Sequence, residues 1–451
     1  MEEAIAAVAT GGVRAAIGII RLSGAGCIPA AGKIFVPKSG VELAQTPPRT
    51  MVYGSLLGRA GQVIDQVLAV QTPAPHTYTG EDTVELHCHG SPAVLALAME
   101  SLLAQGVRLA QPGEFTRRAF LNGKLDLAQA EGVADLIDAR TPVAVYAANR
   151  QLEGALSRRV EEIYQGLLDL AAHFHATVDY PDEDLAPFGR AEIDAALQAA
   201  QSGLDDLLAS YDRGRLVNQG VPCVLVGRPN VGKSSLLNAL LGYERAIVTE
   251  IPGTTRDTVE ELCELGGVPL RLTDTAGLRD TDDQVEQLGV ARSRAALESC
   301  ALALAVLDGS QPLTPEDEQL LALAGRAPRV LCLVNKSDLP AGFAPDALPY
   351  PALRVSAKTG AGIQNLSDAV RDFFPQGGPD SVLLTNPRQF DAASAARAAL
   401  GRAQAALDQG LPPDLPLLDV ETALEALGQL TGRAVREDVV SRVFARFCLG
   451  K

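Results

Sequence analysis

One eight-residue segment constrains the fold of this chain more than any other. Gly-Arg-Pro-Asn-Val-Gly-Lys-Ser at 227–234 fits the phosphate-binding pattern G-x-x-x-x-G-K-[ST]. The apolar run 222–226 before it predicts a buried strand, and residues 233–241 after it predict a helix. A glycine-rich turn between a strand and a helix gathers backbone N–H groups around a phosphate, and the helix N-terminus adds a positive dipole end. The segment therefore predicts an open α/β sheet that binds a phosphorylated ligand at its edge.

Three further motifs specify a guanine nucleotide. They read Asp-Thr-Ala-Gly at 274–277, Asn-Lys-Ser-Asp at 335–338 and Ser-Ala-Lys at 356–358. The apolar run 330–334 predicts a second buried strand, which carries Asn335 and Asp338 to its C-terminal end, where ligands bind in open α/β sheets. The carboxylate of Asp338 matches two adjacent N–H donors on the guanine edge, and adenine has no such pair. The motifs together predict that the substrate is GTP.

Within these motifs, Lys233 is expected to reach the β- and γ-phosphates, and the Ser234 hydroxyl is expected to ligate Mg²⁺. The full set expected to contact GTP comprises Asn230, Val231, Gly232, Lys233, Ser234, Ser235, Asp274, Thr275, Ala276, Gly277, Asn335, Lys336, Ser337, Asp338, Ser356, Ala357 and Lys358.

The composition predicts a large soluble protein of the cytoplasm. The 451 residues allow two or three domains, and 47% hydrophobic residues allow large cores. No apolar run reaches the length of a membrane span, and no N-terminal signal pattern is present, so no membrane partner is expected. The seven cysteines lack C-x-x-C spacing, which favours reduced thiols over disulfides or a zinc site. The net charge of −16 disfavours a generally basic nucleic-acid binder, so a nucleic-acid partner needs a local basic patch or a second protein.

Hydrophobic patterning divides the chain into three regions. Residues 1–118 are expected to form an α+β domain, with strands at 16–22, 51–57, 62–70 and 83–89. Residues 217–377 alternate strand and helix, which predicts a parallel sheet with helices on both faces. The flanks are helical: 119–216, interrupted by a turn at 178–182, and 378–451, with helices at 387–409, 417–430 and 436–447. The economical interpretation is one discontinuous all-α domain, made of both flanks, with the α/β nucleotide domain inserted into it.

Several long strings carry a resemblance over the whole chain. They read GIIRLSG at 18–24, YTGED at 78–82, ELHCHG at 85–90, PGEFTRRAFLNGKLDL at 112–127, GTTRD at 253–257 and FCLGK at 447–451. With the nucleotide motifs, these strings resemble the MnmE (TrmE) family of tRNA-modification GTPases. The resemblance implies an N-terminal tetrahydrofolate-binding domain, a discontinuous helical domain and an inserted Ras-like GTPase domain.

The position after Asp-x-x-Gly holds Leu278, although many small GTPases have there a Gln that orients the attacking water. The resemblance implies that K⁺ supplies positive charge instead, held by Asn230, Thr249, Ile251 and Thr254. It also implies that Glu286 positions the water indirectly. Arg256 and Arg279 stay open as alternative cations or as ordinary solvated charges. The resemblance further implies that Thr255 ligates Mg²⁺ together with Ser234. It also adds these residues to the set expected to contact GTP: Thr249, Glu250, Ile251, Pro252, Gly253, Thr254 and Thr255.

The N-terminal candidates depend on the resemblance. Arg21, Glu85, Lys124 and Lys451 match positions that bind a tetrahydrofolate derivative, either the 5-formyl or the 5,10-methylene form. A carboxylate can accept from the N–H-rich pterin edge, and Arg or Lys can pair with the carboxylates of the glutamate tail. From the sequence alone, each would be an ordinary surface charge.

Two further groups have two readings each. His87 and His89 point to the same side of a strand, and without a third ligand at suitable spacing strand packing is favoured over a metal. Cys448 near the chain end is either a packed helix-end thiol or, by resemblance, a catalytic or positioning group near the folate.

The resemblance implies a K⁺-activated GTP hydrolase that modifies C5 of the wobble uridine, position 34, of certain tRNAs. The added group is of aminomethyl type, built from a folate one-carbon unit. The expected partners are a second copy of the chain in a homodimer, an MnmG-like FAD-dependent protein in a heterotetramer or larger complex, and tRNA. Two alternatives stay open: an Era-like GTPase switch in ribosome assembly, disfavoured by the lack of a basic cluster, and a folate-dependent aminomethyltransferase with a vestigial nucleotide domain, disfavoured by the intact motifs.

Overall fold

The computed structural model describes residues 3–11, 14–179, 189–243, 260–274, 296–374 and 382–433, and a few positions near the C-terminus (440, 443–445, 447 and 450). The chain forms two compact units. One consists of Met1–Ala134, Gln151–Ala200 and Ala395–Lys451, and the other of Asp135–Arg150 and Gln201–Ser394. Among the described residues, no helix is long and apolar enough to cross a membrane.

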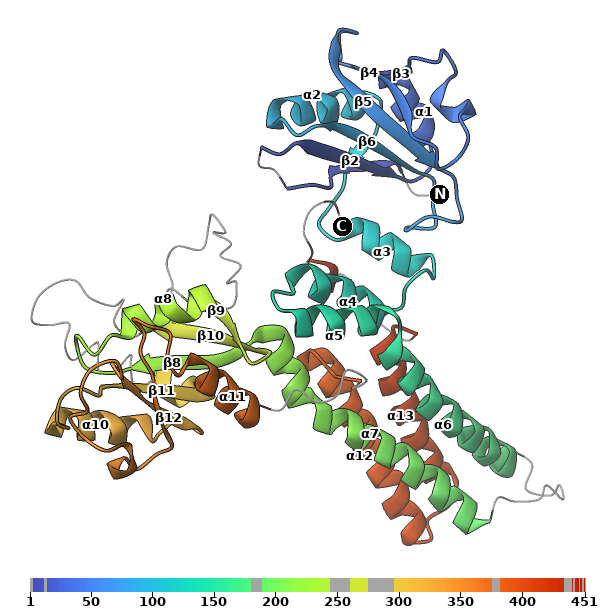
Figure 1. The fold of residues 1–451 in the computed structure, drawn as a ribbon. Coiled ribbons are helices and arrows are strands. Elements are labelled where there is room, and N and C mark those ends of the chain that lie inside the picture. The colour runs from blue at the N-terminus through green and yellow to red at the C-terminus, as the bar shows by residue number, and fades with distance from the viewer. Residues whose placement is uncertain are drawn as a thin grey trace, which may run out of the picture. The chain divides into compact units, whose positions relative to one another are not determined.

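A seven-stranded sheet organises the N-terminal residues, in the order β3-β4-β5-β6-β2-β1-β7 (Figure 1). Neighbouring strands are antiparallel except β1 and β7. The strands are β1 (Ile5–Val8), β2 (Ile17–Ser23), β3 (Phe35–Pro37), β4 (Val52–Leu57), β5 (Val63–Thr72), β6 (Thr83–His89) and β7 (Arg108–Leu109). The four strands predicted from the sequence are confirmed as β2, β4, β5 and β6; β6 has the predicted ends, and the ends of the others differ by at most two residues.

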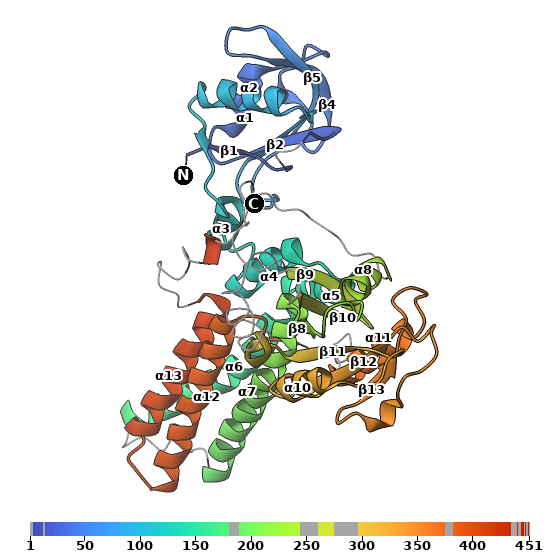
Figure 2. The same ribbon diagram turned by 90° about the vertical axis from the view of Figure 1, so that its left-hand side faces the viewer.

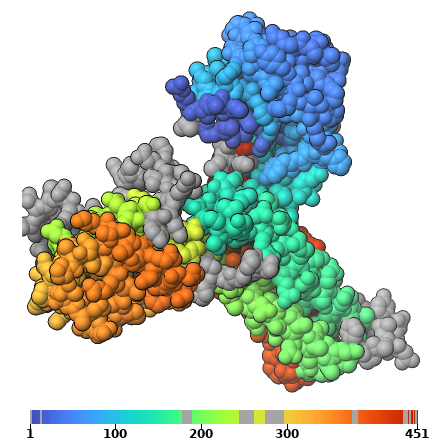
Figure 3. Space-filling view, viewed as in Figure 1, coloured from blue at the N-terminus to red at the C-terminus, as the bar shows by residue number. Residues whose placement is uncertain are grey.

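The two faces of this sheet differ. Helices α1 (Cys27–Ile34) and α2 (Pro92–Leu103), which the sequence pattern did not single out, share one apolar core with the side chains of one face; the short helix η1 (Leu43–Gln45) closes the same core. The opposite face carries Arg21 and Glu85 and exposes Ile17, Tyr53 and Leu68 at 57%, 52% and 39%. In the space-filling view these N-terminal residues, drawn in blue, form a packed body (Figure 3).

The helices of the flanks are α3 (Glu114–Leu121), α4 (Leu127–Asp138), α5 (Pro142–Leu152), α6 (Ala155–Asp179), α7 (Arg190–Gln219), α12 (Pro387–Asp408) and α13 (Asp414–Thr431). Helices α6 and α13 pack side by side although the nucleotide motifs separate them in the sequence (Figures 1 and 2). His175 of α6 lies 2.9 Å from Glu421 of α13, and Gln404 of α12 donates to Asp194 of α7 at 2.9 Å. Helical segments from both sides of the nucleotide motifs in the sequence thus pack together.

A six-stranded sheet carries the nucleotide motifs, in the order β13-β12-β11-β8-β10-β9. Its strands are β8 (Val221–Val226), β9 (Glu260–Leu265), β10 (Val268–Asp274), β11 (Leu302–Asp308), β12 (Val330–Asn335) and β13 (Ala352–Arg354). Every residue of β11 and β12 is buried, because helices cover both faces. Helices α8 (Lys233–Tyr243) and α11 (Ile363–Phe373) share a core with one face, and α10 (Pro315–Ala324) with the other. A short helix, η3 (Pro345–Ala347), precedes β13.

The sequence predicted a parallel sheet, and one strand departs from that expectation. Strand β9 pairs antiparallel with β10, whereas the other pairs are parallel. Gly266 and Gly267 join the two strands with φ angles of +62° and +82°. Two adjacent residues with positive φ form the tight turn whose twist matches an antiparallel hairpin, which is why a Gly-Gly pair stands there.

Two predicted elements lie largely outside the described residues. They are the turn at 178–182, of which α6 includes residues up to Asp179, and the helix at 436–447.

Candidate nucleotide-binding site

The phosphate-binding segment joins β8 to α8 by a turn that needs small residues and left-handed backbone. Asn230 has φ +64° and Gly232 has φ +97°. A Cβ at Gly232 would collide with the Asn335 side chain, and one at Gly227 would lie 2.5 Å from the Val306 carbonyl oxygen. The turn is therefore pressed against the ends of β11 and β12, and only glycine fits at these two points.

Lys233 begins α8 and folds back over this turn. Its Nζ donates to the carbonyl oxygens of Gly227 at 2.7 Å and Arg228 at 2.8 Å, and the residue is 8% exposed. The ammonium is thus held at the centre of the loop, where this motif gathers phosphate oxygens. Ser234 and Ser235 follow it on the exposed surface of the first helical turn.

Asn335 ties three of the motifs together. It ends β12 with only 2% exposure. Its Nδ2 donates to the Val231 carbonyl at 2.8 Å, and its Oδ1 accepts from the Ala357 N–H at 3.0 Å. One buried amide therefore links the phosphate loop, the base motif and the Ser-Ala-Lys segment, with a partner for both its oxygen and its nitrogen.

Asp338 is exposed at the rim of the same sheet edge. The hydroxyl of the fully buried Ser356 donates to its Oδ1 at 2.6 Å, and the Thr359 N–H in turn donates to that hydroxyl at 3.2 Å. The hydrogen bond from Ser356 lowers the pKa of Asp338, so the side chain is an ionised acceptor at neutral pH. A fixed and exposed carboxylate of this kind is what the N–H edge of guanine requires.

Two of the N-terminal candidates meet on the open face of the seven-stranded sheet. Arg21 of β2 and Glu85 of β6 are register partners, and Arg21 Nε lies 2.9 Å from Glu85 Oε1. His87 Nε2 lies 3.3 Å from the other Glu85 oxygen. Lys124 packs against the turn at Gly80. A Cβ added to Gly80 would lie 3.2 Å from the Cε of Lys124. The structure therefore brings three predicted residues, Arg21, Glu85 and Lys124, to the region around strand β6 and the turn before it.

Tyr78 belongs to the same region. Its hydroxyl lies 3.0 Å from the Thr116 hydroxyl. Burial raises the pKa of Tyr78, while the Thr116 hydrogen bond and the positive charge of Arg21 act in the opposite direction. The phenol is therefore neutral at physiological pH and acts as a hydrogen-bonding group.

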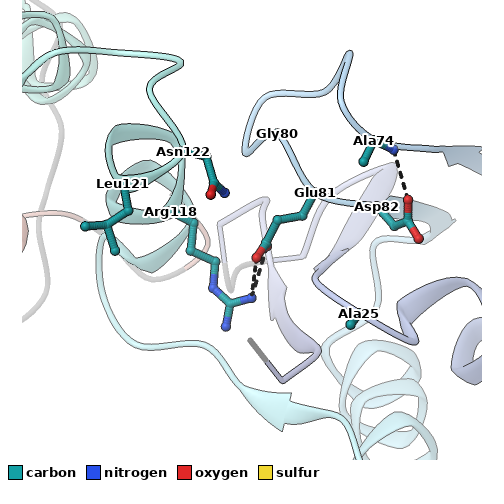
Figure 4. A pocket seen from close by; sticks show the side chains of 8 residues that line it. All are labelled: Ala25, Ala74, Gly80, Glu81, Asp82, Arg118, Leu121 and Asn122. Carbon is teal, nitrogen blue, oxygen red and sulfur yellow. Dashed lines mark hydrogen bonds and ion pairs between the residues drawn. The ribbon is translucent and has the colours of Figure 1, made fainter. Parts of the chain in front are cut away.

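Beside this turn lies a cavity of about 440 Å³, lined by Ala25, Ala74, Gly80, Glu81, Asp82, Arg118, Leu121 and Asn122 (Figure 4). Arg118 is 2% exposed and donates to Glu81 Oε2 at 3.0 Å. Ser23 Oγ also donates to Glu81 at 2.9 Å, and Asp82 accepts from the Ala74 N–H at 2.9 Å. Glu81 and Arg118 were not among the predicted site residues, although both lie in strings that carried the resemblance.

The two histidines have carboxylate neighbours on their own sheet. His89 Nδ1 lies 2.7 Å from Asp65 Oδ1, and its backbone N–H donates to Asp65 Oδ2 at 2.8 Å. Among the described residues, no group of three or more His, Cys, Asp or Glu side chains is placed to hold a metal ion.

Comparisons with known proteins cover nearly the whole chain. Residues 4–124 match the family described as GTP-binding protein TrmE N-terminus, and residues 127–448 match the MnmE helical domain. A tRNA modification GTPase MnmE of Symbiobacterium thermophilum is 44% identical over 100% of both chains. One from Heliobacterium modesticaldum is 45% identical over 100% of this chain and 99% of its own. The chain belongs to the MnmE family.

Membership in the MnmE family settles the enzyme class, because three of the four motifs meet at one sheet edge in a chain whose relatives are named GTPases. The protein is a GTPase. The G domain of the T. maritima FeoB iron transporter also matches, at 24% identity over 34% of this chain and 98% of that chain, but its TM-score of 0.27 is too low to support a conclusion.

Several predicted residues of this MnmE-family chain lie outside the described residues. They are residues predicted to contact GTP or the ions, the proposed water-positioning residue, its neighbours in the argument on hydrolysis, and the two tail residues. The residues are Thr249, Glu250, Ile251, Pro252, Gly253, Thr254, Thr255, Arg256, Thr275, Ala276, Gly277, Leu278, Arg279, Glu286, Cys448 and Lys451. Asp274 is the last residue of β10, but its side chain is also outside. The roles of all these residues stay predictions.

Proposed function

We propose that this protein is a K⁺-activated GTP hydrolase that works with an MnmG-like FAD-dependent partner. Together they install an aminomethyl-type group at C5 of the wobble uridine of certain tRNAs, using a one-carbon unit of a tetrahydrofolate derivative. The observation that carries the proposal is the assembled nucleotide site in a chain whose relatives are named tRNA modification GTPases. GTP turnover on this sheet would drive rearrangement of the chain around it.

In the nucleotide site, Asp338 would accept the N–H edge of guanine, because Ser356 fixes its ionised carboxylate. Lys233 would exchange its loop carbonyls for phosphate oxygens, since its ammonium already lies at the centre of the turn. Ser234 and Thr255 would ligate Mg²⁺, which neutralises charge that builds on the phosphates.

The same loop suits a monovalent cation. Asn230 is exposed and held by φ +64° at the mouth of the turn, so its amide oxygen is available as a hard ligand. With Thr249, Ile251 and Thr254 it would hold K⁺, which supplies positive charge between the β- and γ-phosphates in the transition state. Leu278 cannot orient water, so that task would fall to Glu286.

The open face of the N-terminal sheet suits a folate. Glu85 offers a carboxylate, and Arg21 and Lys124 offer cations within the same region. Exposed apolar side chains, Ile17, Tyr53 and Leu68, share the face. A flat aromatic ring could lie on this face while its polar edge pairs with Glu85. Lys451 and Cys448 are proposed to reach the same ligand from the C-terminal tail.

An exposed apolar sheet face also supports the proposed homodimer, because such a face loses unfavourable contact with water when a second copy covers it. The partner protein would add to this dimer in a heterotetramer or larger complex. The net charge of −16 suggests that tRNA contact needs the partner or a local basic patch. We place the protein in the cytoplasm, and its domains at 1–118, 119–216 with 378–451, and 217–377.

The cation proposal is tested by steady-state phosphate release in matched KCl and NaCl buffers, for the wild type and for Asn230→Ala. The wild type should be faster in KCl by about tenfold or more, since the ion would act on the transition state. Asn230→Ala should lose most of that difference. Equal wild-type rates in both salts would overturn the K⁺ mechanism and return attention to Arg256 and Arg279.

The modification itself is tested by mass spectrometry of wobble nucleosides from cells that lack this protein. Loss of an aminomethyl-type C5 group, restored by the wild-type gene, is expected. Unchanged wobble nucleosides would overturn the tRNA role and leave the GTPase assignment standing.

A further inference from the structure

The connection between β11 and α10, residues 308–317, belongs to none of the four nucleotide motifs, yet it contacts two of them. It begins at Asp308, the register partner of Asn335 on the neighbouring strand, and it ends at Asp317 in the first turn of α10. Both carboxylates are buried, with 7% and 2% exposure. Buried carboxylates are rare unless they are paired, so the partners of these two residues show what they do.

Asp308 holds the lysine of the base motif. Its Oδ2 lies 2.7 Å from Lys336 Nζ, and its Oδ1 accepts from the Ser310 N–H at 3.0 Å and the Ser310 hydroxyl at 2.6 Å. Burial alone would raise the pKa of Asp308, but the hydrogen bonds from Lys336 and Ser310 outweigh it and lower the pKa. The pair fixes a lysine whose backbone is itself left-handed, with φ +63°.

Asp317 holds the arginine of the phosphate loop. Its Oδ1 accepts from Arg228 Nε at 2.6 Å. Its Oδ2 accepts from the N–H and hydroxyl of Thr314, at 3.0 Å and 2.9 Å, in the capping box that begins α10. The Arg228 carbonyl in turn accepts from Lys233 Nζ at 2.8 Å. A fixed helix end therefore reaches the phosphate-binding lysine through one arginine.

We infer that Asp308 and Asp317 are positioning residues of the nucleotide site, Asp308 for the base through Lys336 and Asp317 for the phosphates through Arg228. Long cationic side chains have many rotamers, and a fixed ion pair removes that freedom before the ligand arrives. The two acids lie on one short connection but act on opposite halves of the same ligand. The inference rests on the proposed nucleotide contacts of Lys336 and Lys233.

If Asp308 positions the base contact and Asp317 the phosphate contacts, variants of the two residues should change the affinities for GDP and GMP differently. The measurements are the dissociation constants of GDP and GMP, by calorimetry or by competition with a fluorescent GDP, on the full chain. Asp308→Asn should weaken both nucleotides alike, by about tenfold, because both carry the base and a charged hydrogen bond is lost. Asp317→Asn should weaken GDP by about tenfold and GMP by less than about twofold, because GMP lacks the β-phosphate that Lys233 would hold.

Two controls separate positioning from stability. Thr314→Ala removes the helix cap and one hydrogen bond to Asp317 Oδ2 but leaves the Asp317–Arg228 pair, so it should lower the melting temperature while weakening GDP much less than Asp317→Asn does. Glu318→Gln removes a neighbouring exposed charge in the same helical turn and should change neither quantity. In double variants, Arg228→Gln should add little to Asp317→Asn, and Lys336→Met little to Asp308→Asn.

The inference is overturned if Thr314→Ala reproduces the loss seen in Asp317→Asn, or if both aspartate variants change the GDP to GMP ratio equally. Wild-type GDP affinity in both variants overturns it as well. Asp338→Asn serves as the reference: if that variant keeps wild-type affinity, the proposed base contact has failed instead.

Discussion

The nucleotide site and the open face of the N-terminal sheet bring polar residues together in different ways. In the first, parallel strands end at one edge, so the loops that follow them meet whatever their distance in sequence. In the second, Arg21 and Glu85 stand 64 residues apart on antiparallel strands, and only the register places them opposite each other. A site built from loops therefore shows in the sequence as short contiguous motifs. A site built on a sheet face depends on which residues of different strands are paired, and no short stretch of sequence contains that pairing.

The two sites also differ in how much the fold depends on them. Asn335 and Ser356 are only 2% and 0% exposed, and their hydrogen bonds tie loops together. Arg21 and Glu85 keep side-chain exposures of 26% and 29%, where an ion pair adds little to stability. Changes in the first site should thus affect fold and ligand together, and changes in the second should affect the ligand alone.

The largest effect is expected from Asp338→Asn. The amide offers one acceptor and one donor where guanine needs two acceptors, so GTP should lose about 2–4 kcal/mol of binding free energy. Calorimetry with GTP measures it, and folate binding by the same protein is the internal control. Unchanged GTP affinity would show that Asp338 does not contact the guanine base.

Glu85→Ala and Arg21→Ala should weaken 5-formyltetrahydrofolate by about 1.5–3 kcal/mol, the range for a charged hydrogen bond, and leave GTP turnover unchanged. Fluorescence titration of the full chain measures the affinity. Glu100→Ala, an exposed acid on α2, is the matched control and should bind folate normally. Wild-type affinity in both site variants would mean that the folate binds elsewhere.

Gly232→Ala tests whether the nucleotide loop and the fold are coupled. The added Cβ meets the Asn335 side chain at φ +97°, so the melting temperature and GTP affinity should both fall, with a stability loss of about 1–3 kcal/mol. Gly242→Ala in α8 has open space and should stabilise slightly. If the Gly232→Ala protein were as stable as the wild type, the conformation of the loop would not be coupled to the stability of the fold.

The smallest effect concerns acid stability of the N-terminal region. Burial opposes ionisation of Glu114, but hydrogen bonds from Arg108, the Gln111 N–H and Arg118 lower its pKa below the ordinary 4.5. Its stabilisation is therefore complete above that value and is lost as the pH falls through the lowered pKa.

Glu114→Gln should accordingly cost about 1 kcal/mol at neutral pH, because the amide keeps part of the hydrogen bonding but loses the charge that pairs with Arg108 and Arg118, and less in acid. Thermal unfolding at pH 7 and at pH 3 measures both. A difference that grows in acid would contradict the sign of the shift.

Much of the chain followed from local pattern. Strands β2, β4, β5, β6, β8 and β12 were predicted because alternation or a short apolar run is recorded in the residues themselves. Helices α1 and α2 were not singled out, because short apolar runs do not distinguish a buried helix from a strand. The antiparallel β9 was missed because it sits at the edge of a sheet whose other pairs are parallel.

The sequence by itself determined which chemistry the nucleotide loops can perform, because each loop carries its characteristic groups within a few residues, such as Lys233 in the phosphate loop and the Asp338 carboxylate in the base motif. Only the tertiary structure decided which residues support those loops. Asp308, Asp317, Glu81 and Arg118 lie in strings that could equally be solvated surface, and the packing of distant elements gives each a charged partner far away in the sequence. The physical reason is that a buried charge is tolerated only beside its counter-charge, and folding, not local sequence, decides which counter-charge is near.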